Sequence, residues 1–95
     1  MAMFVLMCVD HPGGLARRMA TREAHLAYVR EHLAMVKAAG PLLDDAGEMA
    51  GSMFIMEAPD KAAVEAFSAA DPYRLAGVFE RVEVRAWKVT VGALA

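Results

Sequence analysis

An unbroken apolar run near the start of the chain, residues 3–9, constrains the fold more than any other feature of the sequence. A strand with one face in water alternates apolar and polar residues, whereas an unbroken apolar run is typical of a strand covered on both faces. The run is too short to span a membrane and lacks the basic start of a signal peptide. It ends at residues 10–14, Asp-His-Pro-Gly-Gly, which are typical of a loop. The sequence therefore predicts a central strand here.

The next segment predicts the first helix. Residues 15–20 are expected to form a short helical turn, and Thr21 is expected to cap a longer helix. Apolar residues recur at the spacing of one helical face, namely Leu26, Val29, Leu33 and Val36. Gly40-Pro41 is expected to end this helix, because proline cannot continue it.

The rest of the chain predicts a hairpin, a second helix and a last strand. The expected segments are strands over 42–46 and 52–57 with a turn at 47–50, a helix over 61–70 capped by Asp60, and a strand over 78–91. The resulting order, strand, helix, strand, strand, helix, strand, is that of a ferredoxin-like α+β fold with a four-stranded antiparallel sheet. The length of 95 residues predicts a single domain, 1–95.

Both helices of such a fold lie on one face of the sheet, which leaves the other face open. The first strand nevertheless supplies apolar residues to both faces: Phe4, Leu6 and Cys8 on one, Met3, Val5 and Met7 on the other. The economical cover for the open face is the same face of a second copy. The sequence therefore predicts a homodimer through the open sheet face.

The charge of the chain argues against nucleic acid as a partner. Ten Lys and Arg stand against twelve Asp and Glu, for a formal net charge of -2, and the two signs are interspersed. The densest basic cluster, Arg17, Arg18 and Arg22, is diluted by Glu23 and Glu31, so we interpret it as a solvated helix flank.

The single cysteine, Cys8, lies within the first apolar run and is expected to be a buried small hydrophobe. One cysteine cannot form an intrachain disulfide, which indicates a reducing compartment. Together with the lack of a signal peptide, lipidation motif or membrane segment, this predicts a cytoplasmic protein with no membrane partner.

Three histidines are candidates for proton transfer near neutral pH. His25 lies beside the apolar stripe of the first helix, His32 lies about two turns further along, and His11 lies in a loop. The sequence has neither a cysteine pair nor histidines at i, i+4, so no metal site is expected. Neither a dinucleotide fingerprint nor a phosphate-binding loop occurs, so no cofactor is expected. Asp44 and Asp45 are expected to alternate faces of a strand and thus to be unable to act as a couple.

Asp71-Pro72-Tyr73 is open to two interpretations. Asp before Pro at a helix exit is a common turn, and Tyr73 could pack with its hydroxyl in water. Alternatively, the carboxylate of Asp71 could orient a histidine and raise its basicity, as in many acid-base sites.

Several short motifs occur in an order that resembles one family. They are Asp10 at the end of the first strand, Arg22-Glu23-Ala24-His25-Leu26, Gly51-Ser52, Asp71-Pro72-Tyr73 and Ala76-Gly77-Val78-Phe79. Together they resemble the YCII-related (YciI-like) family of ferredoxin-like, dimeric α/β-barrel proteins. The chain departs from longer members between residues 46 and 51, where they insert an extended loop, and Glu23 stands where many relatives have proline.

The resemblance implies a cleft in which His25 and Asp71 meet. The family is regarded as acting on small molecules, and elimination chemistry on chlorinated hydroxyaromatics is among its attributed activities. Our first hypothesis is a cofactor-free enzyme in which His25 is the general base or acid, Asp71 orients it, and Arg22, Ser52 and Tyr73 hold a small anionic or hydroxylated ligand. Elimination, isomerisation or hydrolysis would all fit.

Two other functions are compatible with the same sequence. One is a non-catalytic, small-molecule-binding or regulatory dimer in which His25 only donates a hydrogen bond. The other is a structural accessory subunit. An enzyme should lose activity on His25→Ala, a binding protein should lose affinity without turnover, and a structural subunit should show neither effect.

Overall fold

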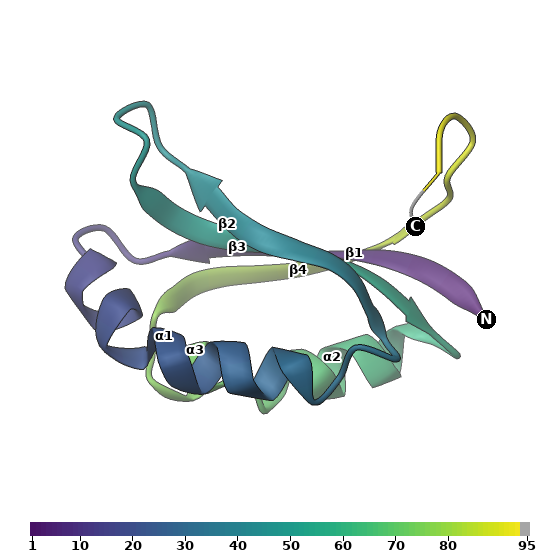
Figure 1. The fold of residues 1–95 in the computed structure, drawn as a ribbon, viewed down its shortest axis with the longest axis horizontal. Helices are drawn as coiled ribbons and strands as arrows, with labels where there is room; N and C mark the ends of the chain where they lie inside the picture. Colours follow the sequence, from purple (N-terminus) through teal and green to yellow (C-terminus); the bar gives the residue numbers. More distant parts are fainter. Residues whose placement is uncertain (94–95) are drawn as a thin grey trace.

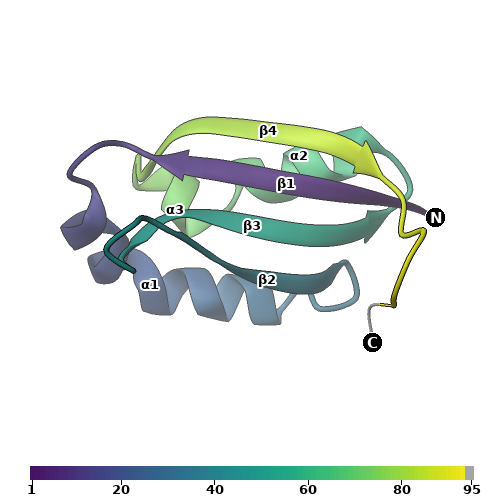
Figure 2. The same cartoon turned by 90° about the horizontal axis from the view of Figure 1, so that it is seen from above.

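The computed structural model describes residues 1–93. Its elements are β1 (Ala2–Asp10), α1 (Leu15–Arg30), β2 (Val36–Leu43), β3 (Met49–Ala58), α2 (Lys61–Ala69), α3 (Pro72–Leu75) and β4 (Phe79–Trp87). The strands form one antiparallel sheet in the order β2-β3-β1-β4 (Figure 2). The predicted ferredoxin-like α+β fold is confirmed, with α3 as an added helical turn.

The helices cover one face of the sheet (Figure 1). β1 is central, as its apolar run predicts, because it pairs with β3 on one side and β4 on the other. Its side chains at Phe4, Leu6 and Cys8 face the helices and are buried. They pack with β3, α1 and α2 residues in a core formed by Phe4, Leu6, Cys8, Val29, Val36, Phe54, Met56, Ala58, Val64 and Phe67.

The predicted start and end of the first helix are wrong. Thr21 lies inside α1, where its hydroxyl donates to the carbonyl of Arg17 at 2.9 Å and caps nothing. Leu33 lies in the turn after α1 and is 60% exposed, and Val36 begins β2 opposite Met56. The apolar spacing of these residues suits a helix, but pairing of β2 with β3 and burial of Val36 against the core override it.

The hairpin also differs from the prediction. Gly40-Pro41 lies within β2 and does not end a helix; proline is tolerated there because β2 is an edge strand and one of its sides needs no ladder bond. Asp44 lies in the tight turn, where its Oδ1 accepts from the backbone N–H groups of Ala46 and Glu48 at 2.9 and 3.0 Å. The expected alternation of Asp44 and Asp45 along a strand is therefore wrong.

The second helix agrees with its prediction. Asp60 caps α2, because its Oδ1 accepts from the backbone N–H of Ala63 at 2.9 Å. α2 ends at Ala69, and Asp71 then caps the short α3. The short break between α2 and α3 places Asp71 on the helix side of the sheet, next to α1.

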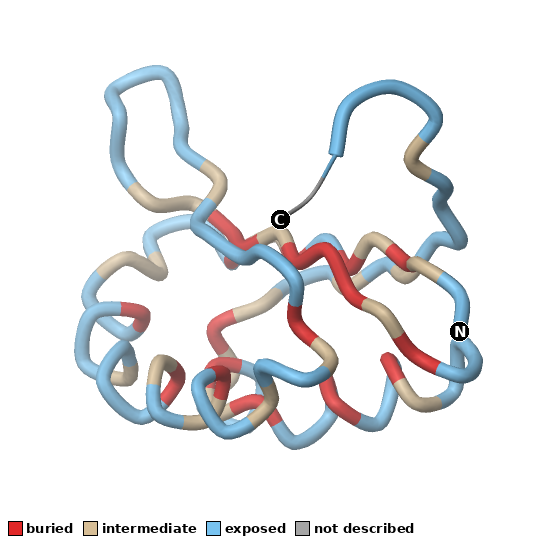
Figure 3. Tube along the Cα trace, turned by 45° about the vertical axis from the view of Figure 1, so that its right-hand side comes forward, coloured by how far each residue is buried: buried red, intermediate tan, exposed pale blue. Residues whose placement is uncertain are grey.

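The other sheet face has no helix over it. The β2–β3 hairpin and residues 88–93 after β4 both rise on this side (Figure 1), and both are largely exposed (Figure 3). The last strand ends at Trp87, short of the predicted residue 91. Among the described residues, no helix is long and apolar enough to cross a membrane.

Candidate functional site

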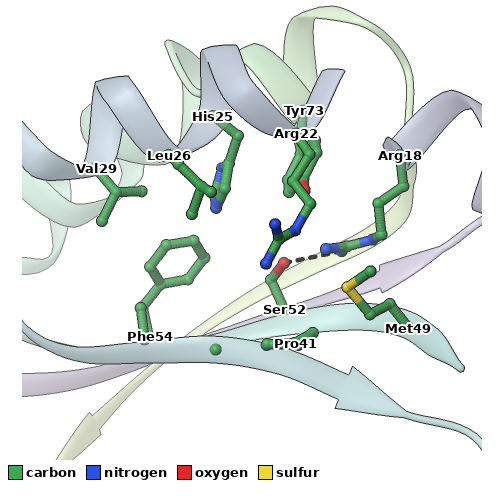
Figure 4. A pocket seen from close by; sticks show the side chains of 12 residues that line it. Arg18, Arg22, His25, Leu26, Val29, Pro41, Met49, Ser52, Phe54 and Tyr73 are labelled. Carbon is green, nitrogen blue, oxygen red and sulfur yellow. Dashed lines mark hydrogen bonds between the residues drawn. The ribbon is translucent and has the colours of Figure 1, made fainter. Parts of the chain in front are cut away.

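A small pocket lies between α1 and the β2–β3 side of the sheet, with Tyr73 of α3 at its inner end (Figure 4). Its volume is about 110 Å³. It is lined by Arg18, Arg22, His25, Leu26, Val29, Ala39, Gly40, Pro41, Met49, Ser52, Phe54 and Tyr73. The lining includes four of the five predicted site residues, Arg22, His25, Ser52 and Tyr73. The fifth, Asp71, lies directly behind His25.

His25 and Asp71 are in direct contact. The Nδ1 of His25 lies 2.9 Å from the Oδ1 of Asp71, and the two residues are 7% and 1% exposed. A carboxylate can only accept, so Nδ1 carries the hydrogen. The same Oδ1 also accepts from the backbone N–H of Tyr73 at 2.9 Å, because Asp71 is the N-cap of α3. The capping bond holds the carboxylate in place for the histidine.

The second ring nitrogen of His25 is left for the pocket. Within residues 1–93, Nε2 of His25 has no hydrogen-bond partner. Every fully enclosed side-chain nitrogen or oxygen in this range does have a partner, so Nε2 is not fully enclosed. Nε2 is therefore open to the pocket that His25 lines. A neutral histidine with Nδ1 protonated has a free acceptor at this position, which is what a general base requires.

Tyr73 lies between His25 and Arg18 (Figure 4). Its ring stacks on the imidazole with centroids 3.9 Å apart and an interplanar angle of 15°, and the Cζ of Arg18 lies 4.4 Å from its centroid. Burial raises the pKa of Tyr73, and the positive charges of Arg18 and Arg22 oppose this rise. Its hydroxyl is therefore protonated near neutral pH and can donate a hydrogen bond.

Arg18 was missed as a site residue by the sequence interpretation, which assigned it to a solvated helix flank. It is 2% exposed, and its Nε and Nη2 donate to the two carboxylate oxygens of Asp10 at 2.7 and 2.9 Å. Burial disfavours the charged guanidinium, but the hydrogen bond and charge of Asp10 outweigh it and raise the pKa of Arg18. Arg18 is therefore a buried, fixed cation.

A helical spacing could have revealed this residue. Arg18, Arg22, His25 and Val29 follow one another at intervals of three or four residues, so they share one face of α1. Since His25 was expected at the helix-sheet boundary, the two arginines on its face should have been expected there as well.

Ser52 and Arg22 complete the polar side of the pocket. Ser52 faces the helices because it pairs with Cys8 of β1, and its hydroxyl accepts from Nη2 of Arg18 at 2.8 Å. Arg22 is exposed and forms no ion pair with any of residues 1–93. The side chains of Arg18 and Arg22 both point toward Ser52 (Figure 4).

The other polar candidates lie elsewhere. His32 lies beyond the end of α1 and donates from Nδ1 to the carbonyl of Tyr28 at 2.7 Å, while His11 is exposed near Glu80. Burial raises the pKa of Cys8 to about 12, so its thiol is protonated and unreactive near neutral pH. In the described part of the chain, no three His, Cys, Asp or Glu side chains are grouped closely enough to hold a metal ion.

Comparison with known proteins assigns the chain to a family. The model of the YCII-related domain matches residues 2–88. The chain belongs to the YCII-related family. Protein YciI of Escherichia coli O6:H1 is 32% identical, and the match covers 90% of this chain and 96% of that protein. An uncharacterized protein of Haemophilus influenzae is 31% identical, and the match covers 90% of this chain and 95% of that protein.

Solved structures agree with this assignment. The 5-chloro-2-hydroxyhydroquinone dehydrochlorinase TftG of Burkholderia phenoliruptrix AC1100, in complex with 2,5-dihydroxybenzoquinone, is 36% identical and superposes with a TM-score of 0.83, covering 90% of this chain and 93% of that one. An antibiotic biosynthesis monooxygenase is 14% identical with a TM-score of 0.58, covering 96% of this chain and 100% of that one, and shares the fold alone. The predicted family membership is therefore confirmed.

Proposed function

We propose that this YCII-related protein is a small-molecule enzyme in which His25 is the general base or acid and Asp71 orients it. One observation carries the proposal: the 2.9 Å contact between Nδ1 of His25 and Asp71, which leaves Nε2 facing a pocket. A base whose far side is held by a buried carboxylate keeps one tautomer and one orientation, and its protonated form is stabilised.

The chemistry follows from what Nε2 can reach. It takes a proton from a ring carbon or hydroxyl of the ligand, and Asp71 stabilises the imidazolium that forms. If a leaving group on the neighbouring carbon departs with its bonding electrons, the reaction is an elimination. Return of the proton to another atom gives an isomerisation. If the proton is taken from water, the hydroxide that forms attacks the ligand, the bond to a leaving group breaks, and the reaction is a hydrolysis.

The pocket limits the substrate to about one ring. A volume of about 110 Å³ is below the ~150 Å³ of an apolar cavity that holds benzene, although this pocket is open on one side. Leu26, Val29 and Phe54 provide apolar walls for a planar ring, while Arg22, Ser52 and Tyr73 supply polar groups. The named activity and the bound ligand of TftG support a small hydroxylated ring as the substrate class.

The test compares turnover and binding in the same preparations. Chloride release from 5-chloro-2-hydroxyhydroquinone measures turnover, and titration calorimetry with 2,5-dihydroxybenzoquinone measures binding. We expect His25→Gln to lower kcat by about 10²- to 10⁴-fold while the protein stays folded. His32→Gln is the matched control, since His32 lies outside the pocket, and should leave kcat unchanged.

Other results would favour the other functions. Binding of the dihydroxybenzoquinone without turnover of this substrate or of related hydroxylated rings would support a binding or regulatory protein. No binding and no turnover would leave a structural subunit. Equal kcat in His25→Gln and wild type would refute the assignment of the base.

We further propose that residues 1–95 form a single domain and that the protein acts in the cytoplasm. We also propose that a second copy of this chain covers the open sheet face. The face carries exposed apolar side chains, among them Met7 on the central strand β1 and Trp87 at the end of the edge strand β4, which are 38% and 40% exposed. The outward side chains of β4 alternate in charge, through Arg81, Glu83 and Arg85. If the β4 strands of two copies face each other with a shift of two residues, each arginine of one copy can lie opposite a glutamate of the other. Light scattering should give a dimer that Met7→Lys dissociates; a monomeric wild type would refute the proposal.

A further inference from the structure

The lining of the pocket contains no carboxylate, and its permanently charged side chains are the guanidinium groups of Arg18 and Arg22. Arg18, Arg22 and His25 line it, whereas the carboxylates of Asp10 and Asp71 lie outside the lining, behind the groups they hold. A ligand in the pocket therefore meets donors and cations, and the acceptors of the site are turned away from it, apart from Nε2 of His25 and the Ser52 hydroxyl.

Arg18 presents a fixed edge to this space. Its Nε and Nη2 are held by Asp10, and Nη2 also donates to Ser52. Nη1 donates to neither Asp10 nor Ser52, so the Tyr73 hydroxyl and a ligand are the groups left for it to meet. The Cζ of Arg18 also lies 4.4 Å from the centroid of the Tyr73 ring, which is a cation–π contact. Donors held in this way need no rearrangement when a ligand binds.

Arg22 adds a positive charge that forms no ion pair with a carboxylate of residues 1–93. It lies one helical turn after Arg18 on the same face of α1, and its guanidinium also points toward Ser52 (Figure 4). A neutral oxygen could accept a hydrogen bond from this cation but would leave its charge uncompensated, whereas an anionic oxygen would do both.

Resting on the proposed function, we propose that the pocket selects a single planar ring bearing an anionic oxygen, a carboxylate or an ionised hydroxyl. This oxygen binds between the guanidinium groups of Arg18 and Arg22, beside Ser52. Arg18 and Arg22 thus determine specificity, and the far side of the ring is presented to Nε2 of His25. The hydroxyl of Tyr73 is a further donor to a ring oxygen.

The test uses two probes that differ in charge but not in shape. Salicylate and salicylamide share a ring and a hydroxyl, and only salicylate carries a carboxylate. Titration calorimetry with the wild-type protein should give at least 10-fold tighter binding of salicylate. Arg22→Gln should weaken salicylate by about 10- to 100-fold, the range expected for one charge-assisted hydrogen bond, and leave salicylamide within a few-fold.

Arg18 needs a paired design, because its removal alone would leave Asp10 buried without a partner. Arg18→Met combined with Asp10→Asn removes both charges together and should stay folded by circular dichroism. We expect this double variant to lose the preference for salicylate as well. Arg17→Gln is the matched control, since Arg17 does not line the pocket, and should bind both probes as the wild type does.

Each outcome decides between the proposals. If the wild type binds both probes equally, or if Arg22→Gln weakens both equally, selection of an anion is refuted while acid-base catalysis by His25 can still stand. If neither probe nor 2,5-dihydroxybenzoquinone binds the wild type, the pocket is not a ligand site and both proposals fail. If salicylate is preferred but His25→Gln keeps full turnover, only the role of His25 fails.

Discussion

Replacing Asp10 by asparagine should destabilise the protein far more than a single surface charge change does. Asp10→Asn leaves Arg18 buried at 2% exposure with no opposing charge, and the amide can accept from only one of the two guanidinium nitrogens that Asp10 now binds. Removing one partner of a buried ion pair costs about 3–5 kcal/mol. The amide retains one bond, so we expect a value near ~3 kcal/mol.

This loss is a large share of the total. A chain of 95 residues has a free energy of unfolding of about 5–14 kcal/mol at ~0.05–0.15 kcal/mol per residue. A loss of ~3 kcal/mol lowers the melting temperature of a domain of this size by about 12 °C or more. The matched control is Glu80→Gln, whose side chain and that of its partner His11 are 55% and 52% exposed, and it should cost below ~1 kcal/mol.

The assay is urea unfolding followed by far-ultraviolet circular dichroism, with equal m-values required for comparison. Arg18→Met combined with Asp10→Asn should recover much of the stability lost in Asp10→Asn, because a buried ion pair can be replaced by neutral groups at little cost. If Asp10→Asn and Glu80→Gln cost the same, Arg18 is not buried beside Asp10 in solution, and the architecture of the pocket is wrong.

Three further predictions concern stability. Burial raises the pKa of Cys8 to about 12, so above pH 9 the thiol ionises in the unfolded chain but keeps its proton in the folded one. The free energy of unfolding should therefore fall by up to about 1.4 kcal/mol per pH unit between pH 9 and 12. In urea unfolding over that pH range, the free energy of unfolding of Cys8→Ala should fall less than that of the wild type. Asp60→Ala removes the cap of α2 and should lower the free energy of unfolding by about 1 kcal/mol; a loss under ~0.3 kcal/mol would contradict the cap. Gly51→Ala places a Cβ 2.4 Å from the carbonyl oxygen of Cys8 and should cost about 1–3 kcal/mol by thermal unfolding, whereas Gly40→Ala meets nothing within 4 Å and should cost little; equal melting temperatures would contradict that packing.

Local chemistry explains which parts of the fold were predictable. The unbroken apolar run of β1 has no stable place except the centre of a covered sheet, and Asp60 before an apolar helical stripe is sufficient to start α2. The end of α1 was not predictable in this way, because residues 31–36 suit a helix locally. Only the pairing of Val36 with Met56 across the hairpin makes them a turn and a strand.

The candidate site likewise has residues that the sequence could predict and one that it could not. Sequence motifs indicated five residues, and the structure brings them together: Arg22, His25, Ser52 and Tyr73 line the pocket, and Asp71 contacts His25. Their roles are predictions. Arg18 was not indicated, because a guanidinium in a basic helical cluster is usually solvated. Its burial depends on Asp10, which arrives from the end of a strand and not from the helix itself.

The sequence by itself therefore determined the order of the elements, the central position of β1 and the family. Only the tertiary structure decided where α1 ends, that Arg18 is buried, and that His25 meets Asp71 from 46 residues away. The physical reason is the separation along the chain of the groups that interact. Apolar patterns and caps act between near neighbours in the chain, whereas an ion pair, a hydrogen bond or a pocket forms only when the packing of distant elements places the groups within reach.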